Sequence, residues 1–244
     1  TALSAVLLSG TGLGTGDDID TVVTNLEGSG GSGGFNLANS GALVIGGVSS
    51  VVGFDAHGAI SITASSPLTV NEAIDSEFDV TLTAAEGGDN ANLDQLTINA
   101  SVSGHNVTLN AGDDVIVNDT VSASENLAIN AGDGVRINDF VFAGELASIT
   151  TGGTVFGAND TAVTCPNTLV FTTTGGIFAD DILLTVQGDI TLGILKAVNT
   201  VTVTAKEDAV RKSYFIDADD IANSPRPILD ASDILTKLRP DMIY

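Results

Sequence analysis

The stretch VTLNAGDDVIVNDTVSASEN (residues 107–126) is followed at once by LAINAGDGVRINDFVFAGEL (127–146). The two stretches align without a gap, with NAGD over NAGD and ND over ND. In each copy, apolar and polar residues alternate over short runs separated by Gly, Asp and Asn, which is typical of short β-strands joined by tight turns. An ungapped repeat of this kind indicates one structural unit that stacks on a copy of itself.

The composition of the whole chain also favours β-structure. Of its 244 residues, 43% are hydrophobic and only 16% are charged, with 28 Gly and no Trp. Val, Ile and Leu alternate with Thr, Ser and Asn, which fit a pleated surface, and the apolar fraction is too high for a disordered chain. No apolar run is long enough for a transmembrane helix, and no signal-peptide pattern is present. The single cysteine, Cys165, excludes an intramolecular disulfide.

The same unit recurs on both sides of the opening pair. Segment 60–74 fits the first copy without a gap. The copy that starts at Val80 fits if about eight residues, EGGDNANL (86–93), are an insertion. Looser copies cover 35–46, 147–157 and 169–181, so the spacing between copies is mostly near 20 residues.

This repeat predicts an all-β fold: a right-handed parallel β-helix (a β-solenoid) with about 20 residues per coil over residues 1–205. Coils would rise by one strand spacing, about 4.8 Å, and connections between parallel strands should be right-handed. An antiparallel sandwich is the competing fold, but it does not require a near-identical period. Residues 206–244 lack the repeat and hold six of the eight basic residues. We expect this C-terminal tail to act as a cap or an assembly segment.

Four asparagines fall at one position of successive repeats: Asn71, Asn99, Asn118 and Asn138. Asn readily adopts turn conformations, and at a corner of the coil its amide can lie along the stack. We therefore expect a structural ladder of side-chain amides that hydrogen-bond from coil to coil. The alternative is that each is an ordinary solvated turn residue.

The phrases SGALVIGGV, ASSPLTVNEA, VTLNAGDDVIVNDTVSA and LAINAGDGVRIND resemble filamentous-haemagglutinin-type repeats. Such repeats occur in very large secreted bacterial surface proteins, many of them two-partner-secretion exoproteins. The resemblance covers roughly residues 7–205 and implies a right-handed parallel β-helix, an extracellular or cell-surface location, and a role in adhesion or surface structure. The chain departs from that family in its short length and in lacking the secretion-domain signature at its N-terminus.

Acidic and amide side chains near turns are the candidate metal ligands. Asp and Gly are the residues that tight turns favour, so turn formation is the simpler interpretation of these positions. The functional alternative is a structural Ca²⁺ held by carboxylates and carbonyls between stacked turns. The candidates are Asp17, Asp18, Asp20, Asn90, Asn92, Asp94, Asp113, Asp114 and Asp133. No other cofactor is expected.

The charge pattern disfavours several functions. The formal net charge is −23, which argues against binding to nucleic acid and to anionic membrane surfaces. Only Arg136 and Lys196 are basic between residues 1 and 205, so an acidic polysaccharide would be repelled. His57 and His105 lie near turns with no nucleophile pattern, and we interpret them as exposed loop residues. We therefore expect no catalysis; the alternative is a protein that binds or cleaves a neutral glycan with surface carboxylates.

One difference between the two opening copies marks a candidate interaction site. Thr120 and Ser122 in the first copy correspond to Phe140 and Phe142 in the second. Two outward aromatic residues indicate a patch that the tail, another subunit or a ligand covers. Together these patterns predict a non-catalytic structural or adhesive protein, part of a surface adhesin or a self-assembling fibre or sheath. Its partners would be copies of itself, other cell-surface components, a host receptor or a glycan.

Overall fold

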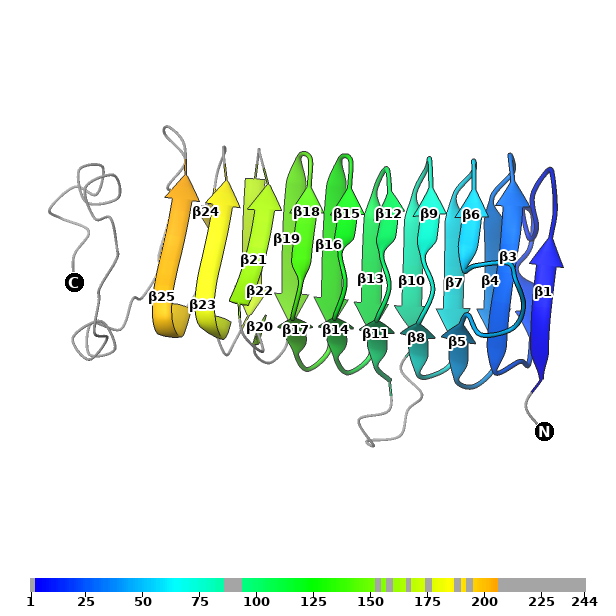
Figure 1. Ribbon diagram of the computed structural model, residues 1–244, viewed down its shortest axis with the longest axis horizontal. Coiled ribbons are helices and arrows are strands. Elements are labelled where there is room, and N and C mark those ends of the chain that lie inside the picture. Colours follow the sequence, from blue (N-terminus) through cyan, green and yellow to red (C-terminus); the bar gives the residue numbers. More distant parts are fainter. Residues whose placement is uncertain are drawn as a thin grey trace, which may run out of the picture.

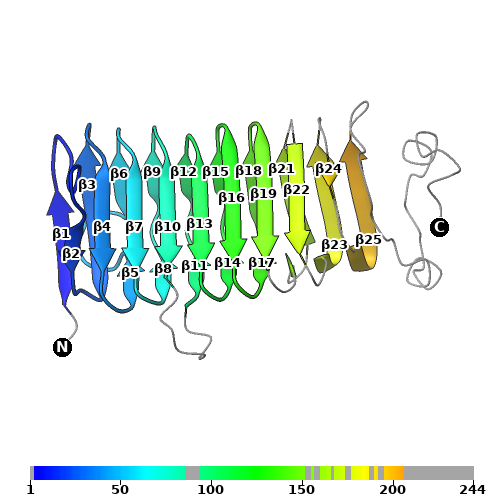
Figure 2. The ribbon, with the colours of Figure 1, turned by 180° about the vertical axis from the view of Figure 1, so that it is seen from behind.

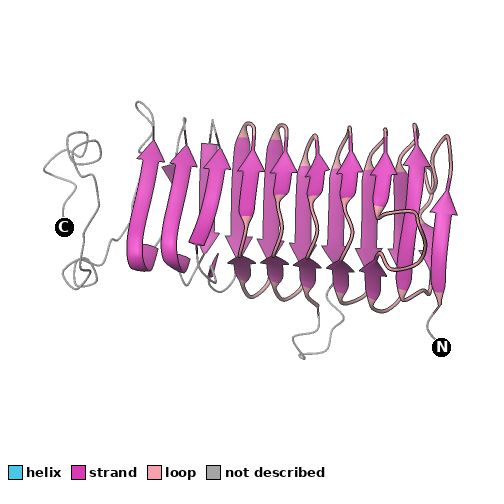
Figure 3. Cartoon of the chain, in the orientation of Figure 1, coloured by secondary structure: helices cyan, strands magenta, loops and turns pink. Residues whose placement is uncertain are grey.

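The computed structural model describes residues 3–85 and 94–151, together with the backbone of six strands between residues 155 and 205. Figure 3 shows strands along the whole of this part of the chain. The described residues form no helix, and hence none that is long and apolar enough to span a bilayer. The predicted insertion (86–93) and the tail (206–244) lie outside the described residues.

One sheet has nine strands in the order β2-β4-β7-β10-β13-β16-β19-β22-β24. Its strands are β2 (Ile19–Thr21), β4 (Phe35–Asn39), β7 (Ile60–Ala64), β10 (Val80–Ala84), β13 (Val107–Ala111), β16 (Asn126–Ala131), β19 (Leu146–Thr151), β22 (Thr168–Thr173) and β24 (Ile190–Thr191). Every third strand of the chain, from β4 to β22, therefore belongs to this sheet.

The other sheet has sixteen strands, most of them in two arms. The first arm comprises β5 (Leu43–Ile45), β8 (Leu68–Val70), β11 (Leu96–Ile98), β14 (Val115–Val117), β17 (Val135–Ile137) and β20 (Val155–Phe156). The second arm comprises β6 (Phe54–Ala56), β9 (Ile74–Ser76), β12 (Val102–Gly104), β15 (Val121–Ala123), β18 (Phe140–Ala143) and β21 (Asp160–Cys165). Longer strands lie at the ends: β1 (Ser4–Leu8), β3 (Asn25–Gly31), β23 (Ile177–Val186) and β25 (Leu195–Ala205). β3 pairs with both β5 and β6, and β23 pairs with both β20 and β21, which joins the arms.

The chain visits the nine-stranded sheet, the first arm and the second arm in turn. We call each such set of three successive strands, for example β7, β8 and β9, a repeat unit. Figures 1 and 2 show the units following one another along the long axis of the molecule. Each pairing between described strands is parallel. The predicted all-β structure with parallel strands is confirmed, and the competing antiparallel sandwich is wrong.

The register between units matches the sequence repeat. Leu82 pairs with Ile62 on one side and Leu109 on the other, and Leu109 pairs in turn with Ile129. Across the predicted insertion, Leu96 still pairs with Leu68 in the preceding unit. Residues of the same kind therefore pair with one another from strand to strand, as an ungapped repeat requires.

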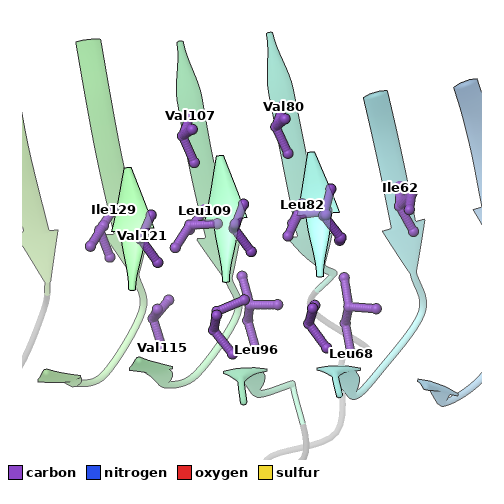
Figure 4. Close-up of a cluster of buried hydrophobic side chains, with 14 of the residues drawn as sticks. Ile62, Leu68, Val80, Leu82, Leu96, Val107, Leu109, Val115, Val121 and Ile129 are labelled. Atoms are coloured by element: carbon purple, nitrogen blue, oxygen red, sulfur yellow. The ribbon is translucent and has the colours of Figure 1, made fainter. Parts of the chain in front are cut away.

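The inward positions of all three rows of strands form one core. Figure 4 shows buried side chains from several units facing the same interior, including Leu68, Leu82, Leu96, Leu109 and Val121. The alternating apolar positions of the first opening copy and their counterparts twenty residues later are at most 1% exposed: Val107, Leu109, Val115, Val117, Val121 and Ala123, and Leu127, Ile129, Val135, Ile137, Val141 and Ala143. Each fully buried aliphatic side chain contributes about 1.5–3 kcal/mol to folding, so these columns dominate the stability of the stack.

Candidate interaction surface

A column of side-chain amides runs along one corner of the stack, between the first and second arms. The Nδ2 groups of Asn99, Asn118 and Asn138 each donate to the Oδ1 atom of the asparagine in the preceding unit, at 2.9, 2.8 and 2.6 Å. Asn71 is the last acceptor of the column. The structure thus brings all four residues of the expected ladder together, and each amide gives an exposed corner a fixed conformation.

Two further columns were not expected from the sequence. On the nine-stranded sheet, Asn130 donates to Asn110 at 2.9 Å, and Asn110 donates to the Thr83 hydroxyl at 3.3 Å. At the corner before that sheet, Asn126 donates to Asn106, and Asn106 donates to the Asp79 carboxylate, both at 2.8 Å. The signal for both columns was present, because Asn106 and Asn110 recur one repeat later as Asn126 and Asn130.

Replacing Asn118 with alanine is expected to lower the free energy of unfolding by about 1 kcal/mol, because one donor and one acceptor of the exposed column are lost. Thr120→Ala, at a half-buried turn position outside the column, is the control and should change stability by less than half as much. Urea unfolding followed by circular dichroism measures both changes. Equal losses in the two variants would contradict a stabilising role for the column.

The predicted aspartates mostly organise turns. Asp94 is 1% exposed, and its backbone N–H donates to the Asp113 carboxylate at 3.0 Å. The Asp114 carboxylate accepts a hydrogen bond from the backbone N–H of Gly134 at 2.9 Å. Asp133 continues the same turn in the next unit, where its N–H donates to the Asp113 carbonyl at 2.9 Å. These residues thus join equivalent turns of successive units.

The remaining metal candidates lie elsewhere. Asp17, Asp18 and Asp20 are exposed at the N-terminal end, where Asp18 accepts a hydrogen bond from Asn36. Asn90 and Asn92 lie outside the described residues. In the described parts, no three His, Cys, Asp or Glu side chains gather into a group that could hold a metal ion. The described candidate metal ligands therefore do not surround a common point at which an ion could bind.

The two histidines have partners that the sequence interpretation missed. His57 Nδ1 lies 2.8 Å from Glu77 Oε1, and His105 Nε2 lies 3.3 Å from Glu125 Oε2. The other ring nitrogen of His105 lies 3.1 Å from the Ser124 hydroxyl. The Ser124 hydroxyl, the His105 imidazole and the Glu125 carboxylate are thus connected in the same order as the groups of a catalytic triad. However, the side chains of His105 and Glu125 are each more than 40% exposed, whereas a triad relies on a buried carboxylate to orient the imidazole.

A buried glutamate holds the long connection between β5 and β6. Glu27 in β3 is completely buried. Its carboxylate accepts hydrogen bonds from the backbone N–H groups of Val48 and Ser49, and from the Ser49 hydroxyl at 2.7 Å. Burial alone would raise the pKa of Glu27, but these hydrogen bonds outweigh it and hold the pKa below its usual value. The ionised form of Glu27 therefore stabilises the folded protein.

A second carboxylate contacts the same connection, residues 46–53, which we call the 46–53 loop. Glu72 Oε1 accepts from the N–H of Gly47 at 3.0 Å, and Oε2 accepts from the N–H of Gly53 at 2.8 Å. In the next unit the corresponding connection comprises only residues 71–73. The two glutamates thus satisfy backbone N–H groups that a longer loop would otherwise leave without protein partners.

The two aromatic residues singled out by the sequence point outward from β18. Phe140 is 37% exposed and Phe142 is partly exposed, while Val141 between them is buried. Their ring centroids are 6.3 Å apart and the ring planes are inclined by 18°, so the rings stack on one another. The pair forms a small apolar patch on the second arm, where the preceding unit has Ser122.

Comparison of the chain with protein-family models, with curated proteins and with solved structures finds no match.

Proposed function

We propose that this chain is a structural or adhesive β-solenoid of the bacterial cell surface or extracellular space, and that it is not an enzyme. In this proposal the three rows of strands form a right-handed parallel β-helix related to filamentous-haemagglutinin-type repeats. The chain would be part of a surface adhesin or a subunit of a fibre or sheath. The resemblance of the repeats supports the location and the role.

The observation that carries the proposal is the continuity of the stack. Leucine, isoleucine and valine columns run through successive units in one register, and amide columns run beside them. Each unit contacts mainly its neighbours, so the molecule resists bending through many equivalent contacts. Handedness is inferred from the strong preference of parallel crossover connections for the right-handed form. A stiff, elongated scaffold suits presentation of binding surfaces better than enclosure of a substrate.

The side chains that could act as acids or bases also support a non-catalytic role. His57 and His105 each pair with a glutamate at an exposed turn. The carboxylate of Glu27 contacts backbone N–H groups of a neighbouring loop and is completely buried. These groups are occupied in holding turns, which is a structural use of polar side chains.

The adhesive part of the proposal is supported by Phe140 and Phe142. A stacked aromatic pair on an acidic protein presents a neutral, apolar contact to a receptor or to the apolar face of a neutral glycan. The tail, 206–244, remains our proposed cap or assembly segment because it concentrates the basic residues of an otherwise acidic chain.

Electron microscopy and a binding assay test the proposal together. The full chain is expected to form rods of uniform width that resist a broad-specificity protease, because successive units share one core. The double variant Phe140→Ala/Phe142→Ala should form the same rods but bind bacterial or host-cell surfaces and immobilised neutral glycans at least about tenfold more weakly. Thr120→Ala/Ser122→Ala, at the equivalent positions of the preceding unit, is the matched control. Compact particles would contradict the structural proposal, and unchanged binding would contradict the adhesive one.

A further inference from the structure

The 46–53 loop covers a charged side chain on the outer side of β3. Leu26 in β3 belongs to the core, so alternation along the strand directs Glu27 to the opposite side, where solvent normally reaches. Glu27 is nevertheless completely buried. The hydrogen bonds that its carboxylate accepts come from Val48 and Ser49 of the loop. The loop is therefore a cover that is held in place by the side chain it covers.

The two ends of the loop are fixed to β3 by backbone hydrogen bonds. At one end, the N–H group of Gly46 donates to the Leu26 carbonyl at 3.0 Å. At the other end, the Gly53 carbonyl accepts from the N–H group of Gly28, also at 3.0 Å. These bonds lie on either side of Glu27 and adjoin the pairings of β3 with β5 and β6. The ends of the loop therefore stay attached to the sheet whether or not the Glu27 side chain holds the middle.

Glycines at both ends of the loop act as hinges. The φ angles of Gly46, Gly47 and Gly53 are 112°, 77° and 61°, in the region that favours glycine. Glycine also adopts many other conformations at little steric cost, so these residues can absorb a change in the direction of the chain. Val52 is 67% exposed, which shows that the outer part of the loop is not packed into the core. The middle of the loop can therefore move while its ends remain paired.

The hydrogen bonds to Glu27 suit its ionised form. The N–H groups of Val48 and Ser49 and the Ser49 hydroxyl all donate to the carboxylate oxygens. A protonated carboxyl carries an O–H group of its own, and among these partners only the Ser49 hydroxyl can accept from it. Burial works to raise the pKa of Glu27, but the hydrogen bonds hold the pKa below its usual value of 4.5. Acid therefore removes the interaction that keeps the middle of the loop in place.

The groups around Glu27 include no positive charge that could replace these donors. β1, β5 and the loop itself carry no titratable side chain, and β6 carries Asp55 at an exposed position. The other carboxylate at the loop is Glu72, which accepts from backbone N–H groups at the two ends of the loop. No lysine or arginine precedes Arg136 in the sequence. The ionised form of Glu27 therefore depends on the donors of the loop, and the closed loop depends on the ionised form.

We propose that the 46–53 loop is an acid-released flap: the ionised carboxylate of Glu27 holds it closed, and protonation of Glu27 frees its middle to turn outward on the glycines while the strands stay paired. Opening presents the segment VSSVV (48–52) to solvent and uncovers the outer side of β3. This device goes beyond the proposed structural function and does not depend on it, because it concerns one loop of one unit.

Hydrogen–deuterium exchange of the full chain, followed by mass spectrometry, tests the proposal. Exchange is compared at about pH 6 and about pH 3.5, on either side of the usual pKa of a glutamate, after correction for the intrinsic exchange rate at each pH. We expect the protection of peptides spanning 46–53 to fall at least about tenfold, while β7 and β10 change less than about twofold. Equal losses in the loop and the strands would mean general acid unfolding, and a loop that stays protected would mean no release. Either result would overturn the proposal.

Three glutamate variants identify the group that holds the loop. Glu27→Gln should leave the loop unprotected at both pH values, because the ionised carboxylate is absent throughout. Glu77→Gln removes an exposed carboxylate that pairs with His57, and it should respond to pH as the natural chain does. Glu72→Gln should also keep a response, because Glu27 is still present. A response that is lost in Glu72→Gln but kept in Glu27→Gln would show that the wrong carboxylate has been assigned.

Ser49→Ala keeps the test decisive if Glu27→Gln folds poorly. The substitution removes one donor to the ionised carboxylate and leaves Glu27 in place. The exchange experiment, repeated over a series of pH values, should show that the loop of this variant opens at a higher pH than the loop of the natural chain. An opening pH that is the same in the two proteins would contradict the role of Glu27 as the group that holds the flap.

Discussion

Replacing Leu109 with alanine is expected to lower the free energy of unfolding by about 3 kcal/mol. Leu109 is completely buried, between Leu82 of the preceding unit and Ile129 of the following one. Removing its side chain leaves a cavity whose walls belong to three units, and the parallel backbone pairings on both sides limit how far those walls can close. For a chain of this size, the loss corresponds to a fall in Tm of about 6–12 °C.

Thr108→Ala is the control for this variant, because Thr108 precedes Leu109 but points to the other side of the sheet. Its free energy of unfolding should change by less than about 1 kcal/mol. Urea and thermal unfolding followed by circular dichroism measure both variants. Similar losses in the two would mean that the buried columns do not carry the stability of the stack. A large loss at Leu109 alone supports the assignment of inward and outward positions.

Glu27→Gln is expected to lower the free energy of unfolding by about 3 kcal/mol at pH 7. The substitution removes the charge that strengthens the bonds from the Val48 and Ser49 N–H groups, and it turns an NH₂ group toward them. Because Glu27 is completely buried, water does not readily replace the lost acceptor. Glu77→Gln is the control, since the side chain of Glu77 is 67% exposed, and it should change stability by no more than about 0.5 kcal/mol.

The same substitution changes how stability depends on pH. The pKa of Glu27 is lower in the folded chain than its ordinary value of 4.5, so the unfolded chain binds the proton more readily. Its contribution is therefore fully present above about pH 5 and is lost as the pH falls below 4.5, through the folded-state pKa. The loss of stability between pH 5 and pH 3 should be smaller in Glu27→Gln than in the natural chain. Parallel pH profiles for the two proteins would contradict the role assigned to this carboxylate.

Much of the architecture could be predicted from the sequence because the repeat supplies its own register. Alternation in 107–126 identifies Leu109 and Val115 as inward, and ungapped copies place residues of the same kind above and below them. The column of Asn118 follows from the same alignment. The columns of Asn106 and Asn110 could have been predicted in this way too, since both residues recur twenty positions later.

Other features depend on contacts that no local pattern encodes. Glu27 occurs in the segment NLEGSGG, which gives no sign that the backbone N–H groups of Val48 and Ser49 meet its carboxylate. Predicting the pairing of His57 with Glu77 would require the exact backbone path of two turns that lie one unit apart.

The amide columns have a consequence for how such a chain can change its length. Asn118 accepts from the asparagine after it and donates to the asparagine before it, and Asn138 bonds to Asn118 in the same way. An in-frame duplication of residues 107–126 would therefore insert a segment whose neighbours on both sides already match it. Each sheet would gain strands and the molecule would grow by about 4.8 Å, with no compensating substitution elsewhere. Recombination can thus lengthen the stack one unit at a time, and two adjacent segments of matching pattern are what such an event leaves behind.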